Sequence, residues 1–218
     1  TKWGIALHDT HFARCDDNVV LFPRGPGIVT ENGEESFNSI QRNLVIGARS
    51  EAGLDDKQQV HPDANGGDGY WFYGLHGSTI KDNHAADCAN MGMTNWLRDE
   101  LETRLVPKFR GADVHARPSD GETIALGSSL PRVLLGNESY GCHLAYSWYR
   151  LSHRWQERGD QAILTPVNHA CWHCLIGAAP YSEHAVRWIA PLFCGDSTVL
   201  NRHQLGFQWG GAVNADTW

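Results

Sequence analysis

The sequence predicts a mainly β fold that carries one or two helices, in a closed or two-sheet architecture. Short apolar runs recur along the chain, and turn-forming residues such as glycine, proline and asparagine separate them. The 218 residues fit one domain, taken as residues 1–218, which is large enough to bury a core without disulfides. The sequence shows no evident internal repeat and no linker.

The first part of the chain alternates expected strands with polar loops. Val45 and Ile46 precede a glycine, which favours a strand over a short helix, and the aromatic run at 70–75 is typical of a buried strand. Residues 51–69 and 76–92 are polar and glycine-containing, so both are expected to be loops. The expected strands are residues 4–7, 19–22, 39–53 and 70–75.

The second part contains the expected helices. Residues 94–106 have apolar side chains at helical spacing, with Thr94 as N-cap and Pro107 as the stop. A short helix is predicted over 182–189, whereas 144–155 fits either a helix or a strand. The remaining expected strands are residues 123–126, 132–135 and 162–165.

The composition is that of a soluble globular protein, with 41% hydrophobic and 20% charged residues. No run approaches the roughly 18 apolar residues of a membrane span, and no signal pattern opens the chain, so we expect no membrane partner and a cytoplasmic location, with secretion left open. The net charge of -7 argues against a nucleic-acid partner. Six cysteines fit either three disulfides or scattered reduced thiols, and the oligomeric state is left open.

A candidate metal site begins at His61-Pro62-Asp63. On a strand, side chains two residues apart point to the same face, so His61 and Asp63 would converge on one point. A 2-His-1-carboxylate iron site needs such a pair, together with a second histidine from a later strand. An oxygenase that uses 2-oxoglutarate also needs a cation for the distal carboxylate of that acid, and arginine serves best.

The chain resembles the phytanoyl-CoA dioxygenase-like family of Fe(II)/2-oxoglutarate oxygenases. The resembling pieces are His61-Pro62-Asp63, residues 70–83, Gly121-Glu122, Asn137-Glu138-Ser139 and residues 144–147, in family order. The resemblance implies a double-stranded β-helix (jelly-roll or cupin-like) core, Fe(II), 2-oxoglutarate as co-substrate, and hydroxylation of a small organic substrate by O2.

Two registers of this resemblance are possible. In the first, the second metal histidine falls on Arg132 and the 2-oxoglutarate arginine falls on His143, so the site has lost a ligand. In the second, His143 is the second metal histidine and Arg154 binds 2-oxoglutarate. We prefer the second register because it completes the iron site as His61, Asp63 and His143.

Three other interpretations stay open. A thiol hydrolase or acyltransferase would use Cys142 as nucleophile and His169 as base. His169 also begins a His-Cys cluster, up to Cys174, that could bind zinc, although buried thiols are the favoured interpretation there. The last is a metal-free or repurposed β-sandwich that serves as a binding or structural domain, with nine tryptophans available for a ligand surface.

Overall fold

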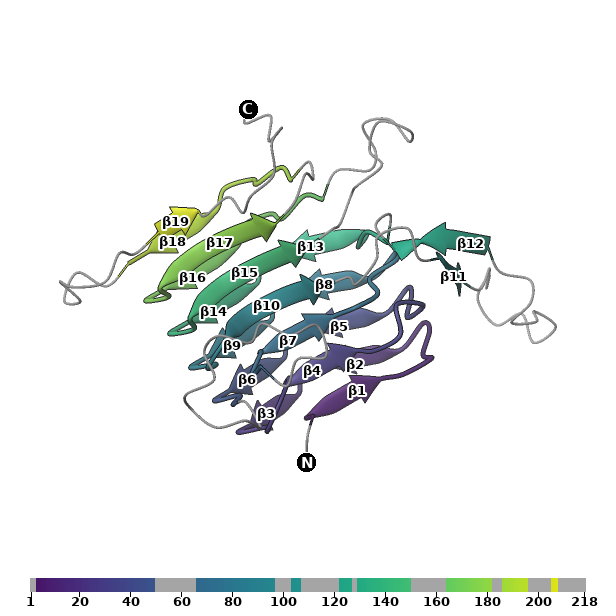
Figure 1. Cartoon of the computed structure of the whole chain (residues 1–218), viewed down its shortest axis with the longest axis horizontal. Coiled ribbons are helices and arrows are strands. Elements are labelled where there is room, and N and C mark those ends of the chain that lie inside the picture. Colours follow the sequence, from purple (N-terminus) through teal and green to yellow (C-terminus); the bar gives the residue numbers. More distant parts are fainter. Residues whose placement is uncertain are drawn as a thin grey trace.

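The computed structural model describes residues 3–49, 66–96, 103–106, 122–126, 129–149, 164–181, 186–195 and 205–207 (Figure 1). The strands are β1 Ile5–Leu7, β2 Arg14–Asp16, β3 Val19–Leu21, β4 Ile28–Thr30, β5 Ser39–Gln41, β6 Leu44–Ile46, β7 Tyr70–Phe72, β8 Thr79–Lys81, β9 His84–Ala86, β10 Met91–Trp96, β11 Thr103–Val106, β12 Glu122–Ala125, β13 Val133–Leu135, β14 Glu138–Tyr140, β15 Leu144–Tyr149, β16 Ala170–Trp172, β17 Ile176–Tyr181, β18 Leu192–Cys194 and β19 Leu205–Phe207. Within these described ranges, none of the chain forms a helix long and apolar enough to cross a membrane.

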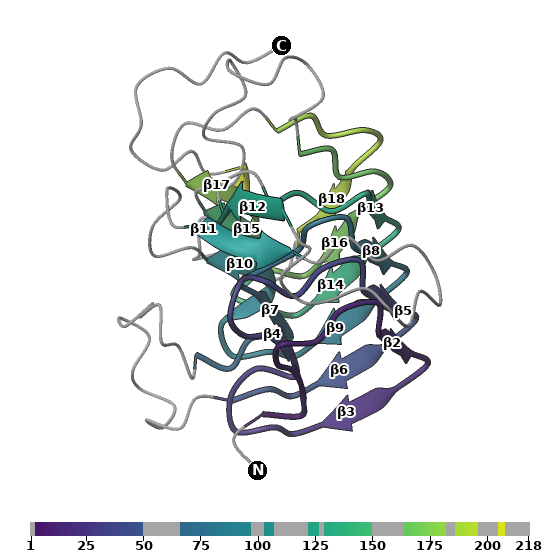
Figure 2. The same cartoon turned by 90° about the vertical axis from the view of Figure 1, so that its right-hand side faces the viewer.

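The strands stack into three sheets that run along the molecule, and the strands within each sheet are parallel. Sheet A has the order β1-β4-β7-β10-β15-β17-β19, sheet B has β13-β8-β5-β2, and sheet C has β18-β16-β14-β9-β6-β3. The chain passes through sheets A, B and C in turn, and each strand then pairs with the strand from the previous passage (Figure 2). This arrangement is a parallel β-helix, and we call one passage through the three sheets a rung. The strands β11 and β12 form a separate antiparallel pair beside the stack.

Sheets B and C are joined by a corner of constant length in every described rung. An eight-residue unit spans the B strand, the corner and the C strand. The units are Arg14–Leu21, Ser39–Ile46, Thr79–Ala86, Val133–Tyr140, 165–172 and 187–194. The fourth residue of each has a positive φ, between 49° and 65°, which turns the chain from sheet B into sheet C. The sequence therefore contains an internal repeat, and the expectation of none was wrong.

The fifth residue of the unit forms a buried hydrogen-bonded row, which we call the asparagine ladder. Asn18 Nδ2 donates to Asn43 Oδ1 at 2.9 Å, Asn43 Nδ2 to Asn83 Oδ1 at 2.9 Å, and Asn83 Nδ2 to Asn137 Oδ1 at 3.0 Å. The fifth member is His169, whose Nε2 lies 3.3 Å from Asn137 Nδ2. Asn43, Asn83 and Asn137 are fully buried, so these bonds satisfy amides that would otherwise carry a desolvation cost.

Sheets A and C approach each other so closely that glycine is needed between them. A Cβ on Gly27 would lie 2.3 Å from Val45 Cγ1, and one on Gly92 would lie 2.1 Å from Ser139 Oγ. Both distances are well inside van der Waals contact. The short distance between sheets A and C at these two places therefore depends on Gly27 and Gly92 having no side chain.

The jelly-roll prediction is wrong. A double-stranded β-helix core is built from antiparallel strands, whereas every pairing within sheets A, B and C is parallel. Parallel stacking pairs a strand with the equivalent strand of the next rung, and residues far apart in sequence become neighbours in this way.

Other local expectations had mixed outcomes. The strand predictions at residues 4–7, 19–22, 70–75 and 132–135 are confirmed by β1, β3, β7 and β13. The helix predicted over 94–106 is wrong, because β10 and β11 occupy its described ends. The loop predicted over 76–92 is also wrong, since it contains β8, β9 and the start of β10.

Candidate functional site

The three sheets present different surroundings to their two faces. In sheet A, β4 and β7 are buried at every position, so side chains on both faces of this part of the sheet are covered. In sheets B and C, the middle residue of a strand such as β5, β6 or β8 is buried and its two neighbours are partly or fully accessible. The accessible outer faces of sheets B and C are therefore the candidate binding surfaces.

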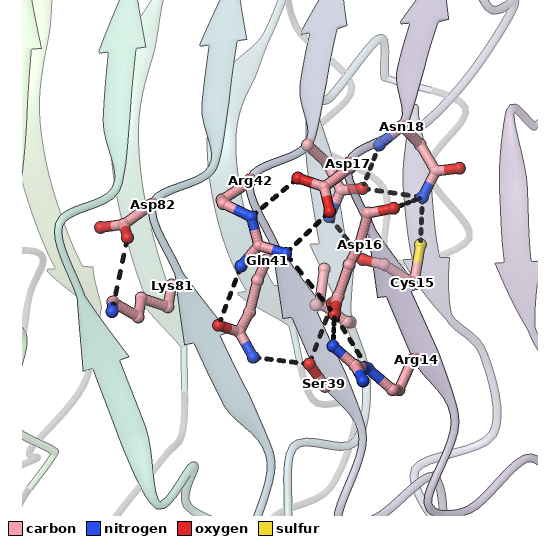
Figure 3. A network of polar contacts seen from close by, with 12 residues as sticks. Arg14, Cys15, Asp16, Asp17, Asn18, Ser39, Gln41, Arg42, Lys81 and Asp82 are labelled. Carbon is pink, nitrogen blue, oxygen red and sulfur yellow. Dashed lines mark hydrogen bonds and ion pairs between the residues drawn. The ribbon is translucent and has the colours of Figure 1, made fainter.

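The outer face of sheet B is polar in its first three rungs (Figure 3). Asp16 Oδ1 accepts a hydrogen bond from Ser39 Oγ at 2.9 Å, and Gln41 Nε2 donates to Ser39 Oγ at 2.6 Å. Arg14 also donates to Asp16, with Nη2 2.9 Å from Oδ2. These groups satisfy one another across adjacent rungs, and exposed ion pairs of this kind contribute little to stability. The face is best explained as a solvated surface.

The outer face of sheet C is apolar over most of its length. The residues whose side chains point outward form two columns in strand register. They are Val19, Leu44, His84, Glu138, Ala170 and Leu192 in one column, and Leu21, Ile46, Ala86, Tyr140, Trp172 and Cys194 in the other. Val19 is 63% exposed, Leu21 55% and Tyr140 53%. Phe22, directly after β3, is 70% exposed, and its ring lies over Gly47 of the next rung.

The histidine and the carboxylate of these columns face each other. His84 Nδ1 lies 3.3 Å from Glu138 Oε2 on the neighbouring strand. Beside them the Tyr140 ring meets the exposed His173 ring edge-on at a centroid distance of 5.4 Å. The outer face of sheet C therefore has an aliphatic end, a histidine–glutamate pair in the middle, and an aromatic end.

A carboxylate pair lies at the corner between sheets A and B in the first two rungs. Glu34 shares a hydrogen bond with Asp9, which raises the pKa of Glu34 to about 7. Asn32 Nδ2 also donates to Asp9 Oδ1 at 2.6 Å, and hydrogen bonding lowers the pKa of Asp9. The nearby Glu35 is buried and accepts the backbone N–H groups of Asn32 and Gly33, so it stabilises this corner. The pair holds one proton near neutral pH, as two adjacent carboxylates do.

Buried thiols stack at the corner that follows sheet C, and we call this stack the thiol column. Cys88, Cys142 and Cys174 are each 2–3% exposed, and the Cys142 thiol is hydrogen-bonded to both of the others. These bonds and burial raise the pKa of Cys142, whereas hydrogen bonds from Cys142 and Cys171 lower the pKa of Cys174. All six cysteines are free, so the three-disulfide alternative is not what this structure contains.

The structure describes only some of the predicted metal-site residues. His61, Asp63 and Arg154 lie outside the described residues. His143 is described and exposed, at the start of the turn into β15, and Arg132 is also exposed. Among the residues the structure describes, no group of three or more His, Cys, Asp or Glu side chains could hold a metal ion.

The predicted thiol nucleophile, Cys142, belongs to the thiol column, and its predicted base, His169, belongs to the asparagine ladder. Cys142 follows β14 in the thiol column, where its thiol contacts the carbonyls of Tyr140 and Ala85. His169 precedes β16, where its ring packs on Tyr146 at a centroid distance of 4.9 Å. Because β14 and β16 are parallel neighbours, Cys142 lies at the carboxyl ends of these strands and His169 at their amino ends. The two side chains are therefore separated by the length of a strand.

His169 is a buried base whose pKa is strongly lowered. It is 1% exposed, and burial lowers its pKa to about 3, so its imidazole is neutral. Its environment is the end of the asparagine ladder rather than a cleft. A histidine with this pKa cannot act as a general base that is half-protonated near pH 7.

Comparison with known proteins supports the observed architecture. Residues 2–108 match the family model described as CEMIP beta-helix. No curated protein and no solved structure matches the chain. The chain is thus similar to a parallel β-helix family over the part that contains β1 to β11.

This similarity overturns the resemblance to the phytanoyl-CoA dioxygenase-like family. Three of the fragments that carried it, residues 70–83, Asn137-Glu138-Ser139 and residues 144–147, are parts of repeated rungs, and Asn137 is the ladder position before β14. Glu122 instead begins β12 of the antiparallel pair, and His61-Pro62-Asp63 lies outside the described residues. The oxidoreductase and iron-binding predictions are corrected with it, and the expectation of Fe(II) and 2-oxoglutarate loses its support.

Sequence reasoning missed the outer face of sheet C and the two buried rows. The signal was present in the eight-residue units, where an Asn at the fifth position stands two residues before a small or apolar residue. Aligning the units by this Asn would have placed Cys88 and Cys142 in one column, and the unit with His169 at the same position adds Cys174.

Proposed function

We propose that this β-helix is a non-enzymatic binding domain that holds an apolar segment of a partner polypeptide on the outer face of sheet C. One observation carries the proposal: four of the eight exposed large hydrophobic residues in the described part of the chain lie on this face. Of the exposed large hydrophobic residues, Val19, Leu21, Tyr140 and Leu192 belong to it, and Phe22 adjoins it. Contiguous exposed apolar surface marks interaction sites, because leaving it in water is costly.

The dimensions of the face suit a narrow ligand. Six strands at a spacing of about 4.8 Å span roughly 24 Å, and three residues at about 3.3 Å give a width near 10 Å. The resulting area of about 240 Å² is small beside the roughly 800 Å² per partner of a stable protein interface. A single peptide segment lying across the strands fits this strip better than a second folded domain or a second copy of the chain.

The charges of the face favour an uncharged, apolar ligand. Its columns hold one histidine and one carboxylate, His84 and Glu138, and these pair with each other. No cluster of lysine or arginine lies on it to neutralise phosphates or an anionic glycan. Aliphatic side chains at one end and the Tyr140 ring at the other can bury apolar peptide side chains.

The test is selection of binding peptides from a random displayed library. The wild-type chain is the target of the selection, and the selected peptides are then titrated against the wild type and the variant Leu21→Asp. Leu21 keeps 55% of its surface exposed, so docking would bury about half of a side chain whose full burial is worth roughly 1.5–3 kcal/mol. A charge in its place adds a desolvation cost, and we expect Leu21→Asp to weaken the selected peptides about tenfold or more.

The matched control is Thr79→Asp, which adds the same charge to the outer face of sheet B. The proposal predicts that selected peptides are rich in apolar residues and bind the wild type and Thr79→Asp equally in titration calorimetry. Equal binding to all three proteins would contradict it. So would dimerisation through this face in sedimentation, or Tyr140-dependent binding of neutral oligosaccharides in place of peptides.

A further inference from the structure

The thiol column at the corner after sheet C repeats with exact equivalence in three rungs. Each cysteine stands two residues after a C strand, behind a residue of positive φ: Asp87, Gly141 and His173. Each Sγ lies near the carbonyl oxygen two residues earlier, at 3.6 Å for Cys88, 3.5 Å for Cys142 and 3.5 Å for Cys174. The three side chains therefore share one orientation.

The column stays in register because the sheet hydrogen bonding continues into the corner. Asp87 N donates to Tyr140 O at 2.8 Å, and Gly141 N donates to Trp172 O at 2.9 Å. Cys174 Sγ also reaches across to Ser139 O of the preceding rung at 3.6 Å. Equivalent residues of adjacent parallel strands lie about 4.8 Å apart, within the Cα separation that a disulfide spans.

We propose that Cys142 and Cys174 are an oxidation site, at which a peroxide converts the two buried thiols into a disulfide that links adjacent rungs. The inference does not depend on what binds sheet C. Cys142 is in hydrogen-bond contact with both neighbours of the column, and it can pair with only one of them. Cys174 is the partner because its Sγ lies 3.6 Å from Ser139 O in the rung of Cys142, whereas Cys142 Sγ lies 3.9 Å from Ala85 O in the rung of Cys88.

The reaction balances with hydrogen peroxide as the oxidant. The Cys174 thiolate attacks one peroxide oxygen, the O–O bond breaks, and with one proton the products are a sulfenic acid and water. The Cys142 sulfur then attacks the sulfenic sulfur, the S–O bond breaks, and the thiol proton leaves with the hydroxide as a second water. Two thiols are oxidised to one disulfide, and one peroxide is reduced to two waters.

The experiment treats the full chain with hydrogen peroxide, blocks remaining thiols under acid denaturation, and maps the tryptic peptides without reduction. Arg150 lies between the two cysteines, so trypsin separates them unless they are linked. We expect the intact mass to fall by two hydrogen atoms, and the Cys142 peptide to appear joined to the Cys174 peptide. The link should be absent in Cys174→Ala and Cys142→Ala, and present in the control variants Cys88→Ala and Cys171→Ala.

Three outcomes would overturn the proposal. The first is a wild-type map without a link, or with only sulfinic acid. The second is a link that survives in Cys174→Ala but disappears in Cys88→Ala, since Cys88 would then be the partner. The third is a link that disappears in Cys171→Ala. Cys171 and Cys174 share one tryptic peptide, so fragmentation of the linked wild-type peptides between these two residues decides the matter even where an alanine variant fails to fold.

Discussion

Replacing His169 by asparagine should remove much of the acid sensitivity of the fold. His169 occupies the ladder position that asparagine holds in four preceding rungs, and it is 1% exposed. Burial is the main reason that its pKa is about 3 in the folded chain, against an ordinary value of 6.5. The folded state therefore keeps the imidazole neutral while the unfolded chain protonates it.

The sign and size of the effect follow from proton linkage. Below pH 6.5 the unfolded state binds a proton that the folded state does not, so the free energy of unfolding falls as the pH falls, until both states are protonated below about pH 3. Between pH 7 and pH 5 this one group costs about 2 kcal/mol, and the full window costs roughly 4–5 kcal/mol.

The assay is denaturant unfolding of the wild type and His169→Asn at pH 7 and pH 5. Asparagine loses the ring packing on Tyr146 and Trp188, so the variant starts from a different stability at pH 7. The expected result concerns the difference between the two pH values, which should shrink by about 2 kcal/mol in the variant. The exposed His84→Asn serves as control. An equal loss of stability in the wild type and His169→Asn would refute the reasoning.

Three further predictions concern buried contacts and a shared proton. Asn83→Ala should lower the free energy of unfolding by about 3 kcal/mol in urea titrations, because it orphans buried ladder partners on both sides; a loss below about 1 kcal/mol would contradict this. Gly92→Ala should cost about 1–3 kcal/mol by overpacking, and Ser139→Gly in the same chain should recover part of the loss in thermal unfolding. Glu34 binds its proton more tightly when folded, so its contribution to stability is lost as the pH rises from about 4.5 to about 7, and Glu34→Gln should flatten that part of the stability profile; an unchanged slope would count against the shared proton with Asp9.

Local strand formation could be read from the sequence where apolar runs are short and bounded by turns. The aromatic run that opens β7 was recognisable, because buried parallel strands are continuously apolar. Residues 94–106 were misread because their apolar spacing also fits a helix. In the structure, Thr94 lies in register with Trp71 and Ser147, and pairing with strands on both sides overrides the local helical pattern.

The repeat escaped detection because its spacing is irregular. The eight-residue units begin at Arg14, Ser39, Thr79 and Val133, and insertions of different lengths separate them. A parallel β-helix needs only that each rung return to the same register, so it does not require a fixed period. The jelly-roll inference followed from reading the units as unrelated strands.

The candidate site was predictable only in part. Cys142 and His169 were predicted as a nucleophile and its base, but each derives its environment from the residues stacked above and below it. Spacing along the chain does not reveal these neighbours. In a solenoid, equivalent residues of successive rungs are the neighbours, and their identity is visible only after the rungs are aligned.

The asparagine ladder also determines where this molecule can change length. The step from the second to the seventh position of the unit, as from Ile40 to Val45 and from Leu134 to Ser139, is the same in every unit, whereas the chain between β6 and β7 or between β10 and β13 is much longer than its counterparts in other rungs. A residue added at the ladder corner would shift one amide out of the row and break bonds to both neighbours. Foreign sequences should therefore be accepted at the corner between sheets A and B and at the corner between sheets C and A. The corner between sheets B and C should be left unchanged when the molecule is used as a scaffold for grafting.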